Sequence, residues 1–210
     1  MFLTDLLFPK SCLGCRKQGH YFCPQCQEEI RPLGFQMTPV TAFFPYKGLI
    51  KKAMVKLKYR FMTDLGDELV ALMIKIIREK KDLAWFKKLN RKRKVILIPL
   101  PLHPKRENWR GFNQSELLGE KLAKALGWQL ETQILVRQKN TQPQVSLRSE
   151  ERKQNVQGSF VVSPQISSNL KRSLIILFDD VWTTGSTMLE AEKVLRKAGF
   201  KKIFCLTVCR

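Results

Sequence analysis

The hydrophobic pattern of the chain changes character at about residue 35. The first 35 residues are rich in turns and cysteines, whereas the rest alternates between apolar runs and amphipathic stretches. Val95–Ile98 and Ser173–Phe178 are mostly apolar and have the length of strands buried on both faces. The amphipathic stretches have the spacing of helices that cover such a sheet. Residues 36–210 are therefore predicted to form an α/β domain with a parallel sheet flanked by helices.

The period of the pattern places the individual elements. The expected strands are Thr41–Tyr46, Val95–Ile98, Ile134–Val136, Ser173–Phe178 and Ile203–Val208. The expected helices are Gly48–Lys58, Asp67–Lys80, Asn113–Leu126 and Thr187–Ala198, the last two ended by Gly127 and Gly199. In the first helix the apolar residues share one arc, and Lys47, Lys51 and Lys58 are expected on the opposite side.

The segment 1–35 carries four cysteines in two close pairs, seven residues apart. The pairs are Cys12-x-x-Cys15 and Cys23-x-x-Cys26. Each pair is expected to form a tight turn, helped by Gly14 and Gly19, and the two turns together supply the tetrahedral thiolate shell of a structural zinc. An iron–sulfur cluster is the alternative. His20 is expected to be a turn residue, and Cys205 and Cys209 small residues of the core.

The charge of the chain points to anionic partners. The formal net charge is +20, with 38 Lys and Arg against 18 Asp and Glu, and it is concentrated in Lys47–Arg60 and Lys87–Lys94. Such a field attracts the phosphates of nucleotides, nucleic acids or membrane surfaces without choosing among them. No apolar run has the length of a membrane span, and Met1–Lys10 lacks the features of a signal peptide. We therefore expect a cytoplasmic protein whose thiols stay reduced.

A strand followed by acids and a small-residue loop carries the strongest chemical signal. The strand over Ser173–Phe178 leads into Asp179 and Asp180, and then into a loop that opens a helix. The loop residues expected to bind phosphate are Thr183, Thr184, Gly185, Ser186 and Thr187. Backbone N–H groups, hydroxyls and the helix N-terminus suit a phosphate there, and carboxylates accept hydrogen bonds from ribose hydroxyls. Together they predict a site for ribose 5-phosphate.

A second polar segment follows the strand Val95–Ile98 and should reach the same end of the sheet. Its three prolines stiffen the backbone, which lowers the entropy lost on binding. The donors expected to face a pyrophosphate are His103, Lys105, Arg106 and Arg110. His103 has the alternative role of capping a turn. Lys139–Asn155 is polar and aperiodic, and is predicted to be a long, mobile loop with a short helix near Arg148.

These motifs resemble those of a known enzyme class and, more specifically, those of one protein family. The string from Leu174 to Thr187 resembles the signature of type I phosphoribosyltransferases. The stretches Pro101–Arg106, Arg110–Gln114 and Thr141–Asn155 resemble those of the ComF family, and the resemblance covers nearly the whole chain. One departure is Trp182, where a smaller aliphatic residue is more usual; its ring is expected to stack on or crowd a bound base.

The resemblance implies a ligand and roles for the residues. It implies that phosphoribosyl pyrophosphate (PRPP) binds with Mg²⁺, and that Asp179 and Asp180 are the catalytic acids that hold its ribose. The loop Thr183–Thr187 would wrap the 5-phosphate, and the segment after Val95–Ile98 would bind the pyrophosphate. The mobile loop would contribute Gln144, Arg148, Arg152 and Asn155. It further implies a role in natural transformation, with single-stranded DNA and other competence proteins as partners.

Three functions remain open from the sequence. In the first, the chain is a phosphoribosyltransferase of the glycosyltransferase class, in which the mobile loop closes over the reaction. In the second, it is a non-catalytic, PRPP-responsive module that binds DNA or protein along the cysteine segment and the two lysine-rich segments. Phe43, Phe44, Tyr59 and Trp109 are candidates for base stacking, with core packing expected for the first two. The third is nucleobase salvage.

Overall fold

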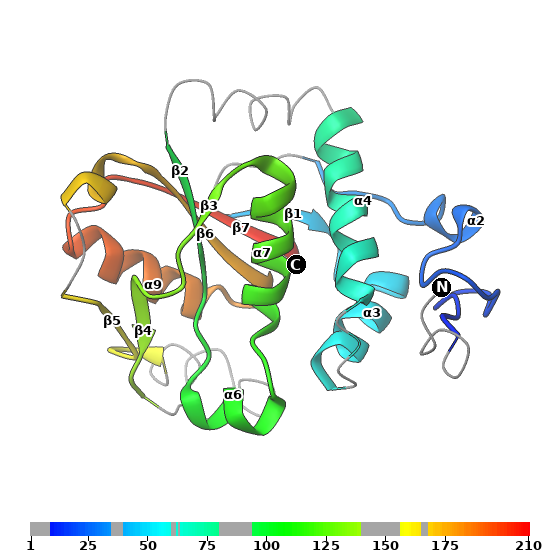
Figure 1. Ribbon diagram of the computed structural model, residues 1–210, viewed down its shortest axis with the longest axis horizontal. Helices are drawn as coiled ribbons and strands as arrows, with labels where there is room; N and C mark the ends of the chain where they lie inside the picture. Colours follow the sequence, from blue (N-terminus) through cyan, green and yellow to red (C-terminus); the bar gives the residue numbers. More distant parts are fainter. Residues whose placement is uncertain are drawn as a thin grey trace.

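A five-stranded parallel sheet forms the centre of the molecule (Figure 1). The computed structural model describes residues 9–34, 40–59, 62, 64–79, 94–139, 156–164 and 168–210. The strands in spatial order are β1 (Thr41–Phe44), β7 (Lys202–Cys209), β6 (Leu174–Val181), β2 (Val95–Pro99) and β3 (Gln129–Leu130). Every neighbouring pair is parallel. The predicted fold class, a parallel sheet flanked by helices, is confirmed.

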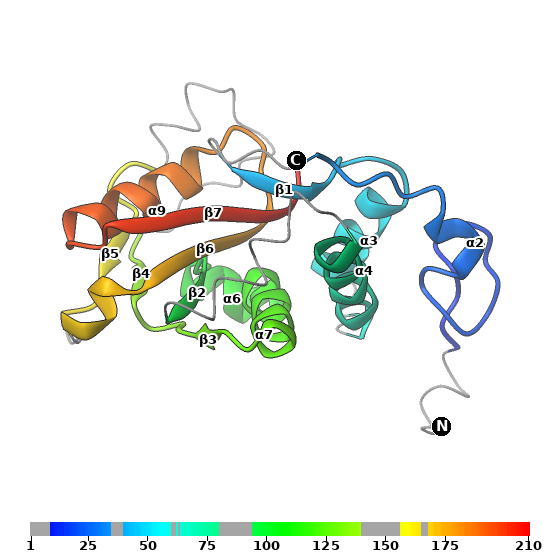
Figure 2. The same cartoon turned by 90° about the horizontal axis from the view of Figure 1, so that it is seen from above.

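Helices cover both faces of this sheet, as Figure 2 shows. One face carries α3 (Gly48–Tyr59), α4 (Leu65–Glu79) and α7 (Gln114–Leu126). The other carries α9 (Ser186–Lys197) and a small antiparallel pair, β4 (Leu135–Arg137) with β5 (Phe160–Val162). Shorter elements are α2 (Pro24–Gln27), α6 (Pro104–Arg110) and the 3₁₀ helix η3 (Ser168–Arg172). No helix of the described residues combines the length and apolar composition that crossing a bilayer requires.

Alternation along the central strands divides the core in two. Leu97, Ile176 and Phe178 point toward α3, α4 and α7, whereas their neighbours Ile98 and Leu177 point toward α9 and β5. Because side chains on a strand alternate between the two faces of a sheet, a run that is apolar at every position is needed where both faces are covered. The continuous apolar runs in the sequence correspond to β2 and β6.

The ends of the predicted elements are set by local chemistry. Asn113 caps α7, because its side chain accepts a hydrogen bond from the backbone N–H of Ser115, and Gly127 ends the helix with a left-handed φ of 66°. The strand predicted over Thr41–Tyr46 ends at Phe44, since Pro45 has no N–H to continue the ladder. The sequence did not indicate α6 or β5.

The cysteine segment does not sit apart from the rest of the chain. Leu13, Tyr21 and Phe22 are buried in the same core cluster as α3 and α4. The Glu68 carboxylate on α4 accepts hydrogen bonds from the backbone N–H groups of Tyr21 (2.9 Å) and Phe22 (2.9 Å). Residues 35–39 lie outside the described part of the chain, so the division of the chain into 1–35 and 36–210 stays a prediction.

Candidate functional site

A cavity of about 420 Å³ lies beyond the carboxyl ends of β2 and β6. This is the end of a parallel sheet where ligands bind, and the volume is that of a small-molecule site. Its walls come from six places in the fold: the end of β6 with the loop after it, the turn after β2, α6 with the start of α7, the turn before α3, the end of α3, and β4. The polar side chains that line it are Tyr46, Lys58, Arg106, Arg110, Gln114, Ser115, Arg137, Asp179, Asp180, Thr183 and Thr187.

The two adjacent carboxylates of β6 lie in this cavity with different partners. Asp179 accepts hydrogen bonds at Oδ1 from the Ser115 hydroxyl (2.7 Å) and from the backbone N–H of Asp180 (2.8 Å). Asp180 accepts at Oδ1 from the backbone N–H of Val181 (2.7 Å), and its Oδ2 lies 2.7 Å from the Lys58 ammonium. Both acids are therefore held by the fold before any ligand arrives.

The environment separates the pKa values of the two acids. Burial, together with the charge of Asp180, raises the pKa of Asp179 to about 7. Burial also opposes ionisation of Asp180, but the adjacent Lys58 ammonium outweighs it and holds the pKa of Asp180 below its ordinary value. The same ion pair outweighs the burial of Lys58 and raises the pKa of its ammonium. At neutral pH Asp180 is ionised, and Asp179 is close to its titration midpoint.

The loop after β6 places its hydroxyls along the same cavity. Thr183 and Thr187 line the cavity, and the hydroxyls of Thr184 and Ser186 lie 3.1 Å apart. Gly185 occupies the N-cap position of α9 with a left-handed φ of 75°. The structure thus brings the predicted phosphate loop beside the predicted ribose acids. That these residues bind PRPP stays a prediction.

Trp182 lies against this loop. A Cβ at position 185 would lie 2.1 Å from the indole ring, so the ring occupies the space that only glycine leaves open. Trp182 packs with the apolar residues between the sheet and α9, and it is absent from the residues that line the cavity. The ring therefore packs against the loop. Because it does not line the cavity, it is not in position to stack on a base bound there.

The predicted pyrophosphate segment forms the short helix α6. Arg106 and Arg110 line the cavity, whereas Lys105 is exposed and is not part of the lining. The His103 imidazole accepts a hydrogen bond from the backbone N–H of Lys105 (3.2 Å), which is the helix-capping role given as its alternative. Burial, and then the charge of Arg110, lower the pKa of Arg106. Two of the four predicted donors thus reach the cavity.

Five polar residues of the cavity were missed by sequence reasoning: Tyr46, Lys58, Gln114, Ser115 and Arg137. The helical pattern placed Lys58 with the lysines opposite the apolar arc, and this was wrong. Lys58 stands in the last turn of α3, where the helix passes the end of β6, and its side chain turns inward to Asp180. Gln114 and Ser115 follow the capping residue of α7, and that signal would have placed them beside the cavity.

Arg137 lines the cavity from β4. The side chain is buried, and its guanidinium lies 5.4 Å from the ring centre of Phe160. Burial, and then the charge of Arg106, lower its pKa to about 10. The predicted strand Ile134–Val136 stops one residue short of Arg137, and no apolar alternation in the sequence marks this side chain for burial. The predicted mobile-loop residues Gln144, Arg148, Arg152 and Asn155 lie outside the described residues.

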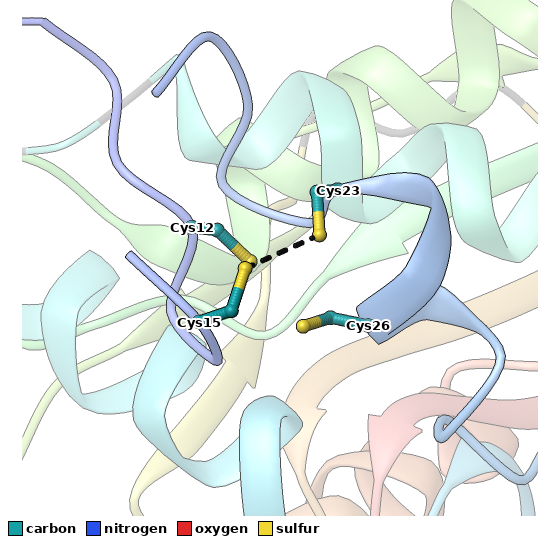
Figure 3. Close-up of side chains that lie close together, drawn as sticks. All are labelled: Cys12, Cys15, Cys23 and Cys26. Carbon is teal, nitrogen blue, oxygen red and sulfur yellow. Dashed lines mark hydrogen bonds between the residues drawn. The ribbon is translucent and has the colours of Figure 1, made fainter. Parts of the chain in front are cut away.

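The four N-terminal cysteines converge on one point, as Figure 3 shows. Their sulfur atoms all lie within 4.8 Å of one another, and those of Cys15 and Cys23 are 3.5 Å apart. Cys12, Cys23 and Cys26 are buried, and Cys15 is exposed. Among the described residues no other His, Cys, Asp or Glu joins these four thiols, and four thiol ligands match the shell of a structural zinc. The cluster can therefore hold a metal ion such as zinc.

Gly14, beside this cluster, is required for the space it leaves and not for its backbone conformation. Gly14 was expected to allow the turn, but its backbone is not left-handed; Arg16 takes that conformation, with a φ of 66°. A Cβ at position 14 would instead lie 2.7 Å from the sulfur of Cys26. Gly14 thus permits the close approach of the two cysteine turns, whereas Gly19, with a φ of 100°, serves the turn as expected.

A basic groove of about 880 Å³ runs between the cysteine turns and α3. Its basic residues are Arg16, Lys51, Lys52 and Lys56, and the apolar side chains of Leu13 and Val55 lie among them. Val55 is 43% exposed although it is apolar. Of the aromatic candidates, Phe43 and Phe44 are core residues and Trp109 is exposed. Residues 87–93 and the side chain of Tyr59 lie outside the described part.

Comparison with known proteins shows sequence relatives that span most of the chain. Competence protein F of Haemophilus influenzae is 30% identical over 209 residues, covering 91% of this chain and 86% of that protein. DNA utilization protein YhgH of Shigella flexneri is 27% identical and covers 99% and 86%. Competence protein ComFC of Bacillus subtilis is 27% identical and covers 90% and 79%.

The other comparisons do not add evidence for the family of the chain. No protein-family model matches the chain. The solved structure of the allosteric regulatory enzyme of purine biosynthesis covers 58% of this chain and 24% of its own, with a TM-score of 0.33 and 17% identity. We therefore take the family of the chain from its sequence relatives alone. Since the similarity to Competence protein F extends over nearly the full length of both proteins, the chain belongs to the ComF family.

Proposed function

We propose that the chain acts in DNA uptake and that its cavity binds PRPP together with Mg²⁺. The names of the relatives, competence and DNA utilization proteins, support the first part. The second part is supported by one observation: a single cavity holds a carboxylate pair, a threonine-lined loop and a set of basic side chains. A phosphorylated sugar that carries a second, strongly charged group needs this combination.

Each part of PRPP has a counterpart in the cavity. The carboxylates of Asp179 and Asp180 accept hydrogen bonds from the ribose hydroxyls. Thr183, Thr187 and the backbone that leads into α9 bind the 5-phosphate, where N–H groups and the helix dipole favour an anion. Basic side chains on the opposite wall bind the pyrophosphate. Mg²⁺ prefers oxygen ligands and keeps several waters, so it enters held by the pyrophosphate oxygens of the ligand.

The cysteine cluster has a structural part in this proposal. Cys12, Cys15, Cys23 and Cys26 hold zinc in a closed shell, which leaves no open position for catalysis. The metal stabilises a segment that is too short for a core of its own.

Calorimetry tests the ligand assignment directly. Zinc-loaded protein titrated with PRPP in the presence of Mg²⁺ is expected to bind, and an Asp179→Ala/Asp180→Ala variant to lose that binding. Ribose 5-phosphate is expected to bind more weakly, since it has no pyrophosphate for the basic side chains of the cavity to contact. Absence of binding by the wild-type protein would refute the ligand assignment, whereas the family membership would stand.

Turnover separates two forms of this function. A phosphoribosyltransferase releases pyrophosphate when the right acceptor, such as a nucleobase or DNA, is added to protein and PRPP. A PRPP-responsive binding module binds the ligand equally well and gives no release with any acceptor. A pyrophosphate assay across nucleobases and single-stranded DNA distinguishes the two, and the Asp179→Ala/Asp180→Ala variant provides the background rate.

The basic groove favours direct contact with single-stranded DNA as part of the uptake role. Nucleic-acid grooves combine cations that follow the phosphates with apolar surface that meets the bases, and this groove has both. Replacing Arg16, Lys51 and Lys52 with glutamine is expected to weaken binding of an oligonucleotide. The slope of log affinity against log salt should fall by about 2, at about 0.7 per single-strand phosphate contact. An unchanged slope would place the DNA elsewhere.

A further inference from the structure

Lys58 is an unusual lysine for a helix that is otherwise basic on its surface. Its ammonium lies 2.7 Å from Asp180 Oδ2, with the lysine side chain 23% exposed and the aspartate 10%. Among the ion pairs of described residues, only this one has both side chains less than a quarter exposed. It also lies inside the cavity and not on the outer surface of α3. A lysine ammonium that is largely buried beside a ligand cavity is expected to have a function there.

The contacts of the carboxylate pair are uneven. Asp180 is engaged at both oxygens, because Val181 donates to Oδ1 while Lys58 and the Gln114 amide (3.5 Å) approach Oδ2. Among the described residues, both hydrogen bonds that Asp179 accepts end on its Oδ1 atom. Asp180 is thus the more firmly held member of the pair, and Asp179 is the member with the greater acceptor capacity left for a ligand hydroxyl.

The charged groups around the pair come from every element packed against it. Lys58 and the Tyr46 hydroxyl approach from α3 and the turn before it, and Cys209 from β7. Arg106 and Arg110 face it from α6 and Arg137 from β4, while α7 contributes only the neutral Gln114 and Ser115. Lys58 is in direct contact with Asp180, since its ammonium lies 2.7 Å from Oδ2.

We propose that Lys58 is a positioning residue, which fixes Asp180 as an ionised carboxylate so that Asp179 alone controls, through its protonation, the binding of the sugar. This inference rests on the proposed function, since it assigns a division of labour within the same ligand site. Lys58 acts through Asp180 and does not itself bind the ligand.

The proposal predicts how ligand binding depends on pH. In the wild-type protein, affinity falls as pH is lowered through about 7, because Asp179 accepts a ribose hydroxyl well only when it is ionised. Without the ammonium, two buried carboxylates share one site and hold a proton to higher pH. In Lys58→Met the midpoint of the pH profile is therefore expected to rise by about one unit or more, the range that a close opposite charge covers.

The experiment measures PRPP affinity by calorimetry between pH 5.5 and 9, with Mg²⁺ held constant. Lys58→Met is expected to lose about tenfold in affinity at pH 7 and to recover most of it at pH 9. Lys58→Arg keeps the charge and should keep the wild-type profile. Lys75→Met is the matched control, since it removes one exposed lysine from α4. The ligand's own ionisation is the same for every variant, so differences between profiles report the protein.

A double-mutant cycle tests whether Lys58 acts through Asp180. Asp180→Asn keeps the shape of the carboxylate and removes its charge, so Lys58→Met should weaken binding in the wild type but add little in the Asp180→Asn background. Additive losses would overturn the proposal, because they would show that Lys58 contributes independently.

Two other results would also overturn it. One is an unchanged profile in Lys58→Met; the other is an equal loss at every pH, which marks direct contact with the ligand. Thermal unfolding of each variant identifies loss of fold, and Lys58→Arg keeps the test valid if Lys58→Met is unstable. Failure of the wild-type protein to bind PRPP would instead refute the proposed function.

Discussion

Asp179 is a carboxyl group that the fold keeps partly protonated at neutral pH. Its pKa is raised from 3.8 to about 7, first by burial and then by the neighbouring charge of Asp180. A group whose pKa is raised on folding stabilises the protein fully below its unfolded pKa, and that contribution is lost as pH rises through the folded pKa. Between about pH 4 and 7, ionisation of Asp179 therefore works progressively against the folded state.

Asp179→Asn should reveal this cost as a gain in stability. The amide keeps an oxygen that accepts from Ser115 and from the backbone but does not ionise, so the variant should be more stable than wild type at pH 8 and nearly equal to it at pH 4. A gain of about 4 kcal/mol at most is expected, since each unit of the pKa shift from 3.8 to about 7 corresponds to about 1.4 kcal/mol. Urea unfolding at the two pH values checks it, with Glu120→Gln, at an exposed position of α7, as control. Equal gains at both pH values would contradict the assignment to ionisation.

Gly185 is a second position where single-residue geometry is decisive. Its φ of 75° disfavours any side chain, and a Cβ would meet the Trp182 ring at 2.1 Å. Gly185→Ala should destabilise the protein by about 2–4 kcal/mol, from the left-handed backbone and the overpacked ring together. Gly34→Ala is the matched control, because no atom lies within 4 Å of that Cβ and the backbone is not left-handed.

Chemical denaturation measures both glycine variants. Combining Gly185→Ala with Trp182→Ala should recover the part of the loss that comes from the ring, since the clash is then removed. If the double variant were as unstable as the sum of the two single variants, the ring would not be what excludes a side chain at this position.

The structure brings the predicted site residues together where they are local in the sequence. Asp179, Asp180 and the threonine loop follow one strand without a break, so one stretch of sequence shows their association. Lys58 and Arg137 come from distant elements, and only the fold brings them to the same cavity. Lys58 follows the buried Met54 by four residues, so the helical period in fact places it beside the apolar face and not opposite to it.

At the scale of elements, α4 carries one side chain that fastens the cysteine segment. Glu68 is in its first turn and accepts hydrogen bonds from the backbone of Tyr21 and Phe22, directly before Cys23. Glu68→Ala leaves two N–H groups without their acceptor, at a cost of about 1–3 kcal/mol for each buried group left unpaired. The four-cysteine site should loosen as a result.

Metal retention provides the measurement for this prediction. Zinc release to a colorimetric chelator should be faster in Glu68→Ala than in wild type, and the midpoint of urea unfolding should be lower. Glu79→Ala, at an exposed position on the same helix, is the matched control. Equal release rates in the two variants would mean that the Glu68 contact does not hold the segment.

Helices and strands with a strong apolar pattern in the sequence were predicted best. The long helices have a clear apolar period and the buried strands β2 and β6 are continuous apolar runs, and each was expected within a few residues of its observed ends. The helix α6 has no buried residue, so no apolar period marks it, although His103, Pro104 and Gly111 supply its end signals. The strand expected over Ile134–Val136 is present as β4, whereas its partner β5 lies on the other side of residues 140–155 and was not expected.

At the scale of the whole molecule, α3 connects the cysteine cluster to the cavity. In its first half the Lys52 ammonium donates a hydrogen bond to the backbone carbonyl of Leu13, within the first cysteine turn (3.2 Å). At its end Lys58 holds Asp180. Between them Ala53, Met54 and Leu57 are fully buried, so the helix is a packed unit and not a loose connection. Disturbance at one end should therefore reach the other.

Removing the metal should accordingly weaken the binding of PRPP. Without zinc the four cysteines lose what holds them together, and Leu13, Tyr21 and Phe22 no longer cover α3 and α4. Protein stripped by a chelator, then dialysed and given Mg²⁺, should bind PRPP several-fold more weakly than zinc-loaded protein, and added zinc should restore the affinity. Because the cluster contributes no residue to the cavity lining, such a loss can only be transmitted through the fold. Equal affinities with and without zinc, in stripped protein shown by circular dichroism to keep its helices, would mean that the cysteine segment serves a partner and not the cavity.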